Sequence, residues 1–325
     1  MCRLAAVISC TVMLAAAGSL PGSAGPEQKV QQTWPLEQAY GALHRGDYQG
    51  AVSEAQQALS KHADDTMLVW RAHQVTIMGL MLLGDEKGAL QHMDRILKQY
   101  ASDVRKAGQR TAIPMNLRIR SLVASSRERL YRRRGNCDRA IEAYLAFLEA
   151  EKRSLACHEG SAKELARLAV DGVFRAELGH RYKCCGKWAL AKQQYQRALE
   201  FVRQYKPPAE TAGMLADPPE QHLARSLPEL IEQCDQAASS PAAAGYALEV
   251  DCKVEIGDFH RVLAEGYSSA ADREKARLAY ESALDYLREH GAPTALGSRA
   301  ERRYRRLLEE TLPSLVAKSG PPQES

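Results

Sequence analysis

A skeleton of small and apolar residues recurs along the chain in a spacing typical of one face of an α-helix. In residues 46–59, Gly46 and an aromatic residue are followed by Ala51, Ala55, Ala58 and Leu59. Spacings of four, three and one residues bring these last four side chains to one face. The skeleton returns as Gly84, Ala89, Met93, Ile96 and Leu97; as Gly135, Ala140, Tyr144, Phe147 and Leu148; as Gly186, Trp188, Ala191, Tyr195, Ala198 and Leu199; and, without the glycine, as Ala276, Tyr280, Ala283 and Leu284.

An amphipathic helix is also predicted before each turn glycine, as in residues 67–83 and 165–184. A unit of two such helices buries its apolar face only against its neighbour. The pattern resembles the tetratricopeptide repeat family over most of residues 35–290. That resemblance implies an all-α fold, an antiparallel helix-hairpin array curved into a shallow superhelix. The alanines that open successive skeletons lie 38, 51, 51 and 85 residues apart, against about 34 in the family, so we expect longer helices or loops.

The first residues are typical of a cleaved secretory signal. Arg3 is the single charge in residues 1–24, an apolar run of 14 residues follows it, and small residues stand at 22–24. The run is shorter than the roughly 20 residues that cross a membrane. We therefore expect a secreted, periplasmic or secretory-lumen protein, with an uncleaved anchor as the alternative.

The remaining segments are predicted as a linker at 25–34, the repeats at 35–205, a proline-rich linker at 206–220, a C-terminal helical region at 221–318 and a disordered tail at 319–325, with a shorter break at 239–244.

Composition narrows the classes of function. The 325 residues are 45% hydrophobic and only 6% aromatic, with few β-branched residues, which favours helices and excludes a β-sandwich or a polytopic membrane protein. The net charge of +4 is too small to indicate a nucleic-acid partner. Two clusters of arginine residues are typical of solvent-exposed helix faces with acidic neighbours. The alternative is that they bind acidic partners or the headgroups of anionic lipids. The two clusters are Arg118, Arg120, Arg127, Arg129 and Arg132–Arg134, and Arg299, Arg302, Arg303, Arg305 and Arg306.

A second resemblance concerns residues 257–265, which read Gly-Asp-Phe-His-Arg-Val-Leu-Ala-Glu. This run resembles the central helix of the 14-3-3 phosphopeptide-binding family, and the similarity extends over about 240–297. It implies that Arg261 binds a phosphate, with Lys183 or Lys187 as a second cation. Val262 stands where the family has a tyrosine, which removes one phosphate hydrogen bond. The alternative is that Arg261 pairs with Glu265 one helical turn later.

Six cysteines follow the predicted signal. They are Cys137, Cys157, Cys184, Cys185, Cys234 and Cys252. In an exported chain an even number permits disulfides of undetermined pairing, and buried free thiols are the alternative. No Cys-x-x-Cys pair indicates zinc, so we expect no metal or other cofactor.

No nucleophile elbow, phosphate loop or paired catalytic carboxylates stand out, so we expect no enzyme. The leading hypothesis is a non-catalytic adaptor or scaffold that binds peptide segments or protein partners on a concave surface. The alternatives are a 14-3-3-like phosphopeptide-binding adaptor and a structural subunit of a secreted assembly.

Overall fold

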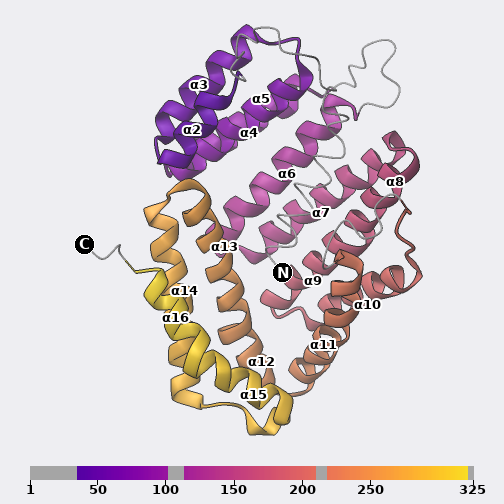
Figure 1. Cartoon of the computed structure of the whole chain (residues 1–325), viewed down its shortest axis with the longest axis vertical. Coiled ribbons are helices and arrows are strands. Elements are labelled where there is room, and N and C mark those ends of the chain that lie inside the picture. Colours follow the sequence, from indigo (N-terminus) through magenta and orange to yellow (C-terminus); the bar gives the residue numbers. More distant parts are fainter. Residues whose placement is uncertain (1–34, 102–112, 210–217, 321–325) are drawn as a thin grey trace, which may run out of the picture. The chain divides into compact units, whose positions relative to one another are not determined.

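The described part of the chain is helical throughout. The computed structural model describes residues 35–101, 113–209 and 218–320, and every regular element within these ranges is a helix, with no strand (Figure 1). This confirms the predicted all-α class. The signal predicted at 1–24, the linker at 25–34 and residues 321–325 of the predicted tail lie outside the described residues.

The chain divides into two compact units, and the division differs from the predicted one. One unit contains the described residues within 35–170 and 206–209, and the other contains 171–205 and 218–320. The predicted linker at 206–220 instead joins α10 (Trp188–Gln204) to α11 (Pro219–Ser239). These two helices belong to one unit and pack against each other. The prolines of this segment stand near the end of α10 and the start of α11, and they do not mark a boundary between domains.

The first unit is a series of helices in which each member contacts the next. They are α2 (Glu37–Arg45), α3 (Tyr48–Lys61), α4 (Thr66–Leu82), α5 (Glu86–Gln99), α6 (Met115–Arg133), α7 (Cys137–Ser154), the 3-10 turn η1 (Leu155–Cys157) and α8 (Gly160–Arg167). The amphipathic helix predicted at 67–83 is α4. The π-helical segment η2 (Leu168–Val173) continues α8 into the second unit.

A left-handed glycine followed by a capping residue joins α2 to α3. Gly46 has a φ angle of +81°, which L side chains rarely adopt. The carboxylate of Asp47 then accepts a hydrogen bond from the backbone N–H of Gly50 at 2.9 Å. Together the two residues end one helix and begin the next. The other predicted turn glycines also have positive φ: Gly84, Gly135 and Gly186.

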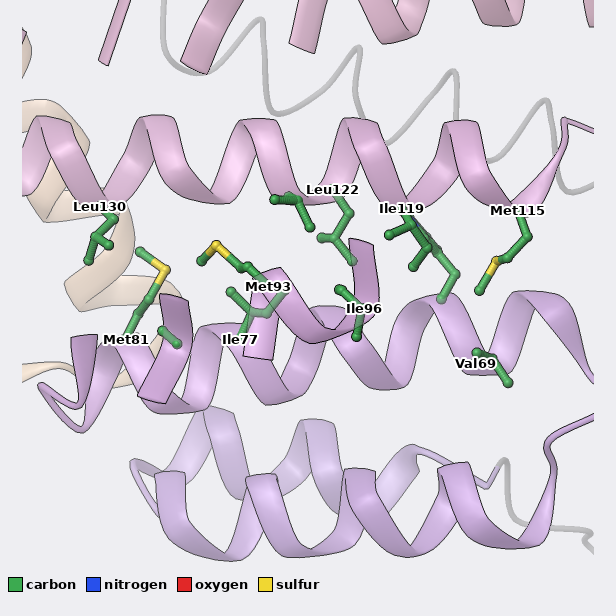
Figure 2. Packing of buried hydrophobic residues seen from close by; sticks show 12 residues of the cluster. Val69, Ile77, Met81, Met93, Ile96, Met115, Ile119, Leu122 and Leu130 are labelled. Carbon is green, nitrogen blue, oxygen red and sulfur yellow. The ribbon is translucent and has the colours of Figure 1, made fainter. Parts of the chain in front are cut away.

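The core of the first unit lies between α4, α5 and α6. Ile77 of α4, Met93 and Ile96 of α5, and Ile119 and Leu130 of α6 point toward one another (Figure 2) and are each at most 1% exposed. Burial of such side chains stabilises the folded state by roughly 1.5–3 kcal/mol each. Two of the five, Met93 and Ile96, belong to the recurring skeleton.

The second unit continues the pattern of packed helices. Its elements are α9 (Phe174–Cys184), α10, α11, α12 (Pro241–Tyr246), the π-helical η3 (Ala247–Cys252), α13 (Lys253–Tyr267), α14 (Ala270–His290), the 3-10 turn η4 (Thr294–Leu296), α15 (Ser298–Arg306), the π-helical η5 (Leu307–Thr311) and α16 (Leu312–Lys318). The break predicted at 239–244 is a single residue, Ser240. Its hydroxyl caps α12 by accepting from the Ala243 N–H at 3.3 Å, so a new helix begins at once.

The recurring skeleton lies in the core of both units. Its buried members are Ala51, Ala55, Ala58, Ala89, Met93, Ile96, Ala140, Tyr144, Leu148, Ala191, Tyr195, Ala198, Leu199, Ala276, Tyr280, Ala283 and Leu284. The spacing therefore identified the inward faces of five helices: α3, α5, α7, α10 and α14.

Candidate functional site

A groove runs between α6 and α7, which lie side by side in the first unit (Figure 1). It has a volume of about 610 Å³. Leu97 at the end of α5, together with Val123 and Ala124 of α6 and Ala143 and Ala150 of α7, gives it an apolar lining. Small side chains on both helices leave room above the helix contact, and that room forms the groove.

Helical spacing places the polar side chains along the same groove. On α6, Arg120, Arg127 and Tyr131 are separated by seven and four residues, which keeps them on one face. On α7, Arg139 and Arg153 lie near the two ends of the helix. The groove thus combines an apolar lining with cationic sides.

The charges of the groove are unequally compensated. Four arginines and two glutamates line it. Arg127 forms an ion pair with Asp94 of α5. Arg153 pairs with Glu149 on its own helix, with 3.0 Å between Nε and Oε1. Arg153 and Glu149 are both more than half exposed, so that pair holds its arginine only weakly, whereas the Arg127 side chain is 31% exposed.

Two further arginines carry the positive character of the groove. Arg120 is exposed and forms no ion pair within the part of the chain that the structure describes. The guanidinium of Arg139 lies over the ring of Tyr131, 5.7 Å from the centroid, a cation–π contact that keeps the charge at the groove. Arg120 and Arg139 are therefore available to an anionic group.

A separate polar contact holds α6 against α7. The Ser121 hydroxyl donates to the Glu151 carboxylate. Burial raises the pKa of Glu151, while this hydrogen bond and the charge of Arg118 oppose the rise. The Arg118 Nε donates to the Ile113 carbonyl at 3.2 Å. These side chains fix the helix pair that forms the groove and do not line it.

The structure places Arg261, the predicted phosphate anchor, among carboxylates. Its Nη1 donates to Glu265 at 2.8 Å, and its Nη2 lies 3.5 Å from Asp258. The hydrogen bond to Glu265 raises the pKa of Arg261. The Tyr280 hydroxyl donates to the same Asp258 carboxylate at 2.8 Å. The predicted alternative, an ion pair with Glu265, is therefore the arrangement observed.

Lys183 and Lys187, the predicted helper cations, occupy different environments. Lys183 is only 4% exposed. Burial lowers its pKa, but the surrounding acidic groups, Asp251 first and then Cys252, Cys184 and Glu255, outweigh that effect and raise it. The charge of the ammonium group is therefore compensated inside the unit. Lys187 is half-buried at the start of α10. Since Arg261 and Lys183 each have carboxylate neighbours, neither presents an uncompensated charge to a phosphate.

The C-terminal arginine cluster is also paired with acids. Arg299 pairs with Glu229 at 3.0 Å, and Arg303 pairs with Asp251. Arg305 pairs with Glu301 on the same helix at 2.6 Å. This outcome agrees with the prediction of arginine faces with acidic neighbours.

The six cysteines of the described residues are free thiols. Cys157, Cys234 and Cys252 are buried, and the other three are half-buried. Within the described ranges, no three or more His, Cys, Asp or Glu side chains gather as a metal site. In the same ranges, no helix combines the length and apolarity needed to cross a bilayer.

Sequence reasoning selected Arg120 and Arg127 as members of a cluster but missed Tyr131, Arg139 and Arg153. A signal was present in α7, where Ala143, Ala146 and Ala150 follow one another at spacings of three and four. Such a stripe indicates a face with little side-chain volume. That this face of α7 packs beside α6 depends on the tertiary fold, and the spacing of residues within one helix does not reveal it.

Comparison of the chain with protein-family models, with curated proteins and with solved structures gave no match.

Proposed function

We propose that the protein is a non-catalytic helical adaptor that binds an acidic peptide segment in the groove between α6 and α7. The observation that carries the proposal is the combination of an apolar lining with Arg120 and Arg139 on one 610 Å³ groove. Apolar side chains of a peptide would fill the space above the alanines, and its carboxylates would meet the guanidinium groups.

The charge of the groove favours an acidic ligand over a basic one. Glu142 and Glu149 also line the groove, but Glu149 is already paired with Arg153. A bound carboxylate would gain attraction from Arg120 and Arg139, whereas a lysine would meet a net positive field. The contacts lie near the surface, so salt should weaken binding.

Fluorescence anisotropy with a short labelled peptide of alternating Glu and Leu tests the proposal. We expect binding that weakens as NaCl rises from roughly 0.05 to 0.5 M. The double variant Arg120→Glu, Arg139→Glu should bind about tenfold more weakly or worse, since about 1.4 kcal/mol of lost attraction corresponds to a factor of ten. A peptide of alternating Lys and Leu should not bind.

Lys152→Glu is the matched control. Lys152 is an exposed residue of α7 that does not line the groove, so this substitution makes the same reversal of charge as Arg139→Glu, on the same helix. The control should bind like the wild type. Equal binding by the double variant, or equal loss in the Lys152→Glu protein, would contradict a site in this groove.

A further inference from the structure

Two contacts between α6 and α7 fix the register of the two helices along the groove. The guanidinium of Arg139 lies over the ring of Tyr131, and the Ser121 hydroxyl donates to the Glu151 carboxylate. From the first contact to the second, the chain runs back ten residues along α6 and forward twelve residues along α7. The two helices are therefore antiparallel, with one register from end to end of the groove.

This register places arginines at the two ends of the groove. Arg139 lies with Tyr131 at the end next to the turn that joins the helices. Arg120 and Arg153 lie at the opposite end, each within two residues of the second contact. Arg120 and Tyr131 are 11 residues apart, which corresponds to roughly 16 Å along the helix axis. The groove thus presents an exposed cationic group at each end, Arg120 at one and Arg139 at the other.

Between the two ends the floor of the groove is apolar and made mostly of alanine. On α6 and α7 it consists of Val123, Ala124, Ala143, Ala146 and Ala150. All of these except Ala146 are at most 8% exposed. Small side chains of this kind let a further helix approach closely and set its larger apolar side chains above them.

Helix and strand geometry decide which conformation of a ligand reaches both ends. Backbone groups in the middle of a helix are hydrogen-bonded within it, so α6 and α7 offer no edge to which an extended peptide adds as a strand. In an extended chain, residues five apart span roughly 16 Å but point to opposite faces. In a helix, residues 11 apart span the same length and differ in direction by only about 20°. A helix therefore matches both the separation and the common direction of the two cationic ends.

We propose that the segment bound in this groove is an amphipathic α-helix with acidic residues at positions i and i+11 and apolar residues at i+4 and i+7. These four positions share one face of the helix. One acid meets Arg120 and the other meets Arg139, while the apolar side chains pack on the alanines between them. The inference rests on the proposed function, because it specifies the conformation and the residue pattern of the acidic segment.

Two capped peptides of the same composition test the pattern. Each has about 16 residues, enough for partial helicity in water, and contains two Glu and two Leu among Ala and Gln. In the first peptide the acids stand at i and i+11. In the second they stand at i and i+9, which turns them to opposite faces of the helix. We expect the full chain to bind the first peptide at least about tenfold more tightly in fluorescence anisotropy, and the bound peptide to show helical carbon chemical shifts by NMR.

Charge exchange between protein and peptide tests the assignment of the two ends. Arg120→Glu and Arg139→Glu, made singly, should each bind the first peptide about fivefold more weakly. Two further peptides carry Lys in place of one Glu, either the one at i or the one at i+11. One of them should restore binding to Arg120→Glu, and the other should restore binding to Arg139→Glu. Lys152→Glu is the matched control and should bind all of these peptides like the wild type.

The outcomes separate this inference from the proposed function. If neither the first peptide nor the peptide of alternating Glu and Leu binds, both are wrong. If the alternating peptide binds and the first peptide binds no better than its i+9 counterpart, the acidic groove stands and the helical ligand is overturned. Restoration of both variants by the same Lys peptide, or of neither variant by either peptide, also overturns it.

Discussion

The ring of Tyr280 lies directly against the backbone of Gly257. A Cβ atom at Gly257 would be 2.4 Å from Cε1 of the tyrosine ring. Gly179 and Tyr195 repeat the relationship between α9 and α10, with the same 2.4 Å separation. In both pairs the absence of a side chain on one helix lets an aromatic residue of the next helix fill the contact. Both tyrosines are members of the recurring skeleton.

Replacement of Gly257 by alanine should destabilise the second unit by about 1–3 kcal/mol, because the added methyl group overlaps the Tyr280 ring and forces the helices apart. The loss should appear as a lower midpoint of urea unfolding followed by circular dichroism.

Gly266→Ala is the matched control, since Gly266 lies on the same helix and a Cβ there meets nothing within 4 Å. Alanine has the better helix propensity, by about 1 kcal/mol at most. The Gly266→Ala protein should therefore be as stable as the wild type or more so. A similar loss of stability in both variants would show that the contact with Tyr280 does not cause the effect.

Arg261 should contribute nothing to peptide binding. Glu265 and Asp258 already compensate its charge, so a phosphopeptide would have to displace a formed ion pair. In an array of matched phosphorylated and unphosphorylated peptides, Arg261→Ala should bind the same peptides as the wild type. Any preference for phosphate should instead disappear in the Arg120→Glu, Arg139→Glu protein. Loss of phosphate-dependent binding in Arg261→Ala alone would restore the 14-3-3-like interpretation.

Local spacing was sufficient to predict the inward faces of the helices. Ala51, Ala191 and Ala276 are all fully buried, as the skeleton required, and the turn glycines have the left-handed backbone that a sharp reversal needs. Both features depend on residues within a few positions of one another. Helix geometry alone therefore determines them.

The environment of Lys183 could not be predicted in this way. Its sequence neighbours suggest an exposed basic turn, but the lysine is buried, and the charges of Asp251 and Glu255, about 70 residues further along the chain, act on it. The groove is a similar case, since Arg139 becomes a groove residue only when α7 packs on α6. Interactions of this kind depend on which helices become neighbours, and a single sequence does not reveal that.

The stability of the second unit should depend strongly on the buried residue Asp251. It is 8% exposed and accepts hydrogen bonds from Arg303 and, at 3.1 Å, from the Tyr304 hydroxyl. Asp251→Asn would leave Lys183 with less compensation, and we expect a loss of about 3 kcal/mol in the free energy of unfolding. Asp285→Asn, which breaks an exposed pair with Arg288, should cost less than about 0.5 kcal/mol. If urea denaturation gave the same loss in the free energy of unfolding for both variants, the buried Asp251 carboxylate would stabilise the protein no more than the exposed one of Asp285.

The stability of the first unit should depend on two neighbouring histidines. His73 Nδ1 of α4 lies 3.2 Å from His92 Nε2 of α5. Burial, followed by the charge of the partner histidine, lowers the pKa of His73 to about 4. Burial, followed by the charge of Arg95, lowers the pKa of His92 to about 4. Both side chains are therefore neutral in the folded protein at neutral pH.

A depressed histidine pKa makes folding sensitive to acid. Above about pH 6.5 the histidines are neutral in both the folded and the unfolded chain, and they add no pH dependence. As the pH falls from 6.5 toward 4, the unfolded chain takes up protons that the folded chain does not, so stability decreases. The loss is about 3 kcal/mol for His73 and smaller for the more exposed His92, and it levels off near pH 4. Urea midpoints measured across this range should fall more steeply in the wild type than in the His73→Gln, His92→Gln double variant. Replacement of the exposed His62 by glutamine is the matched control and should leave the wild-type profile unchanged; identical profiles in all three proteins would show that the histidine pair does not couple protonation to folding.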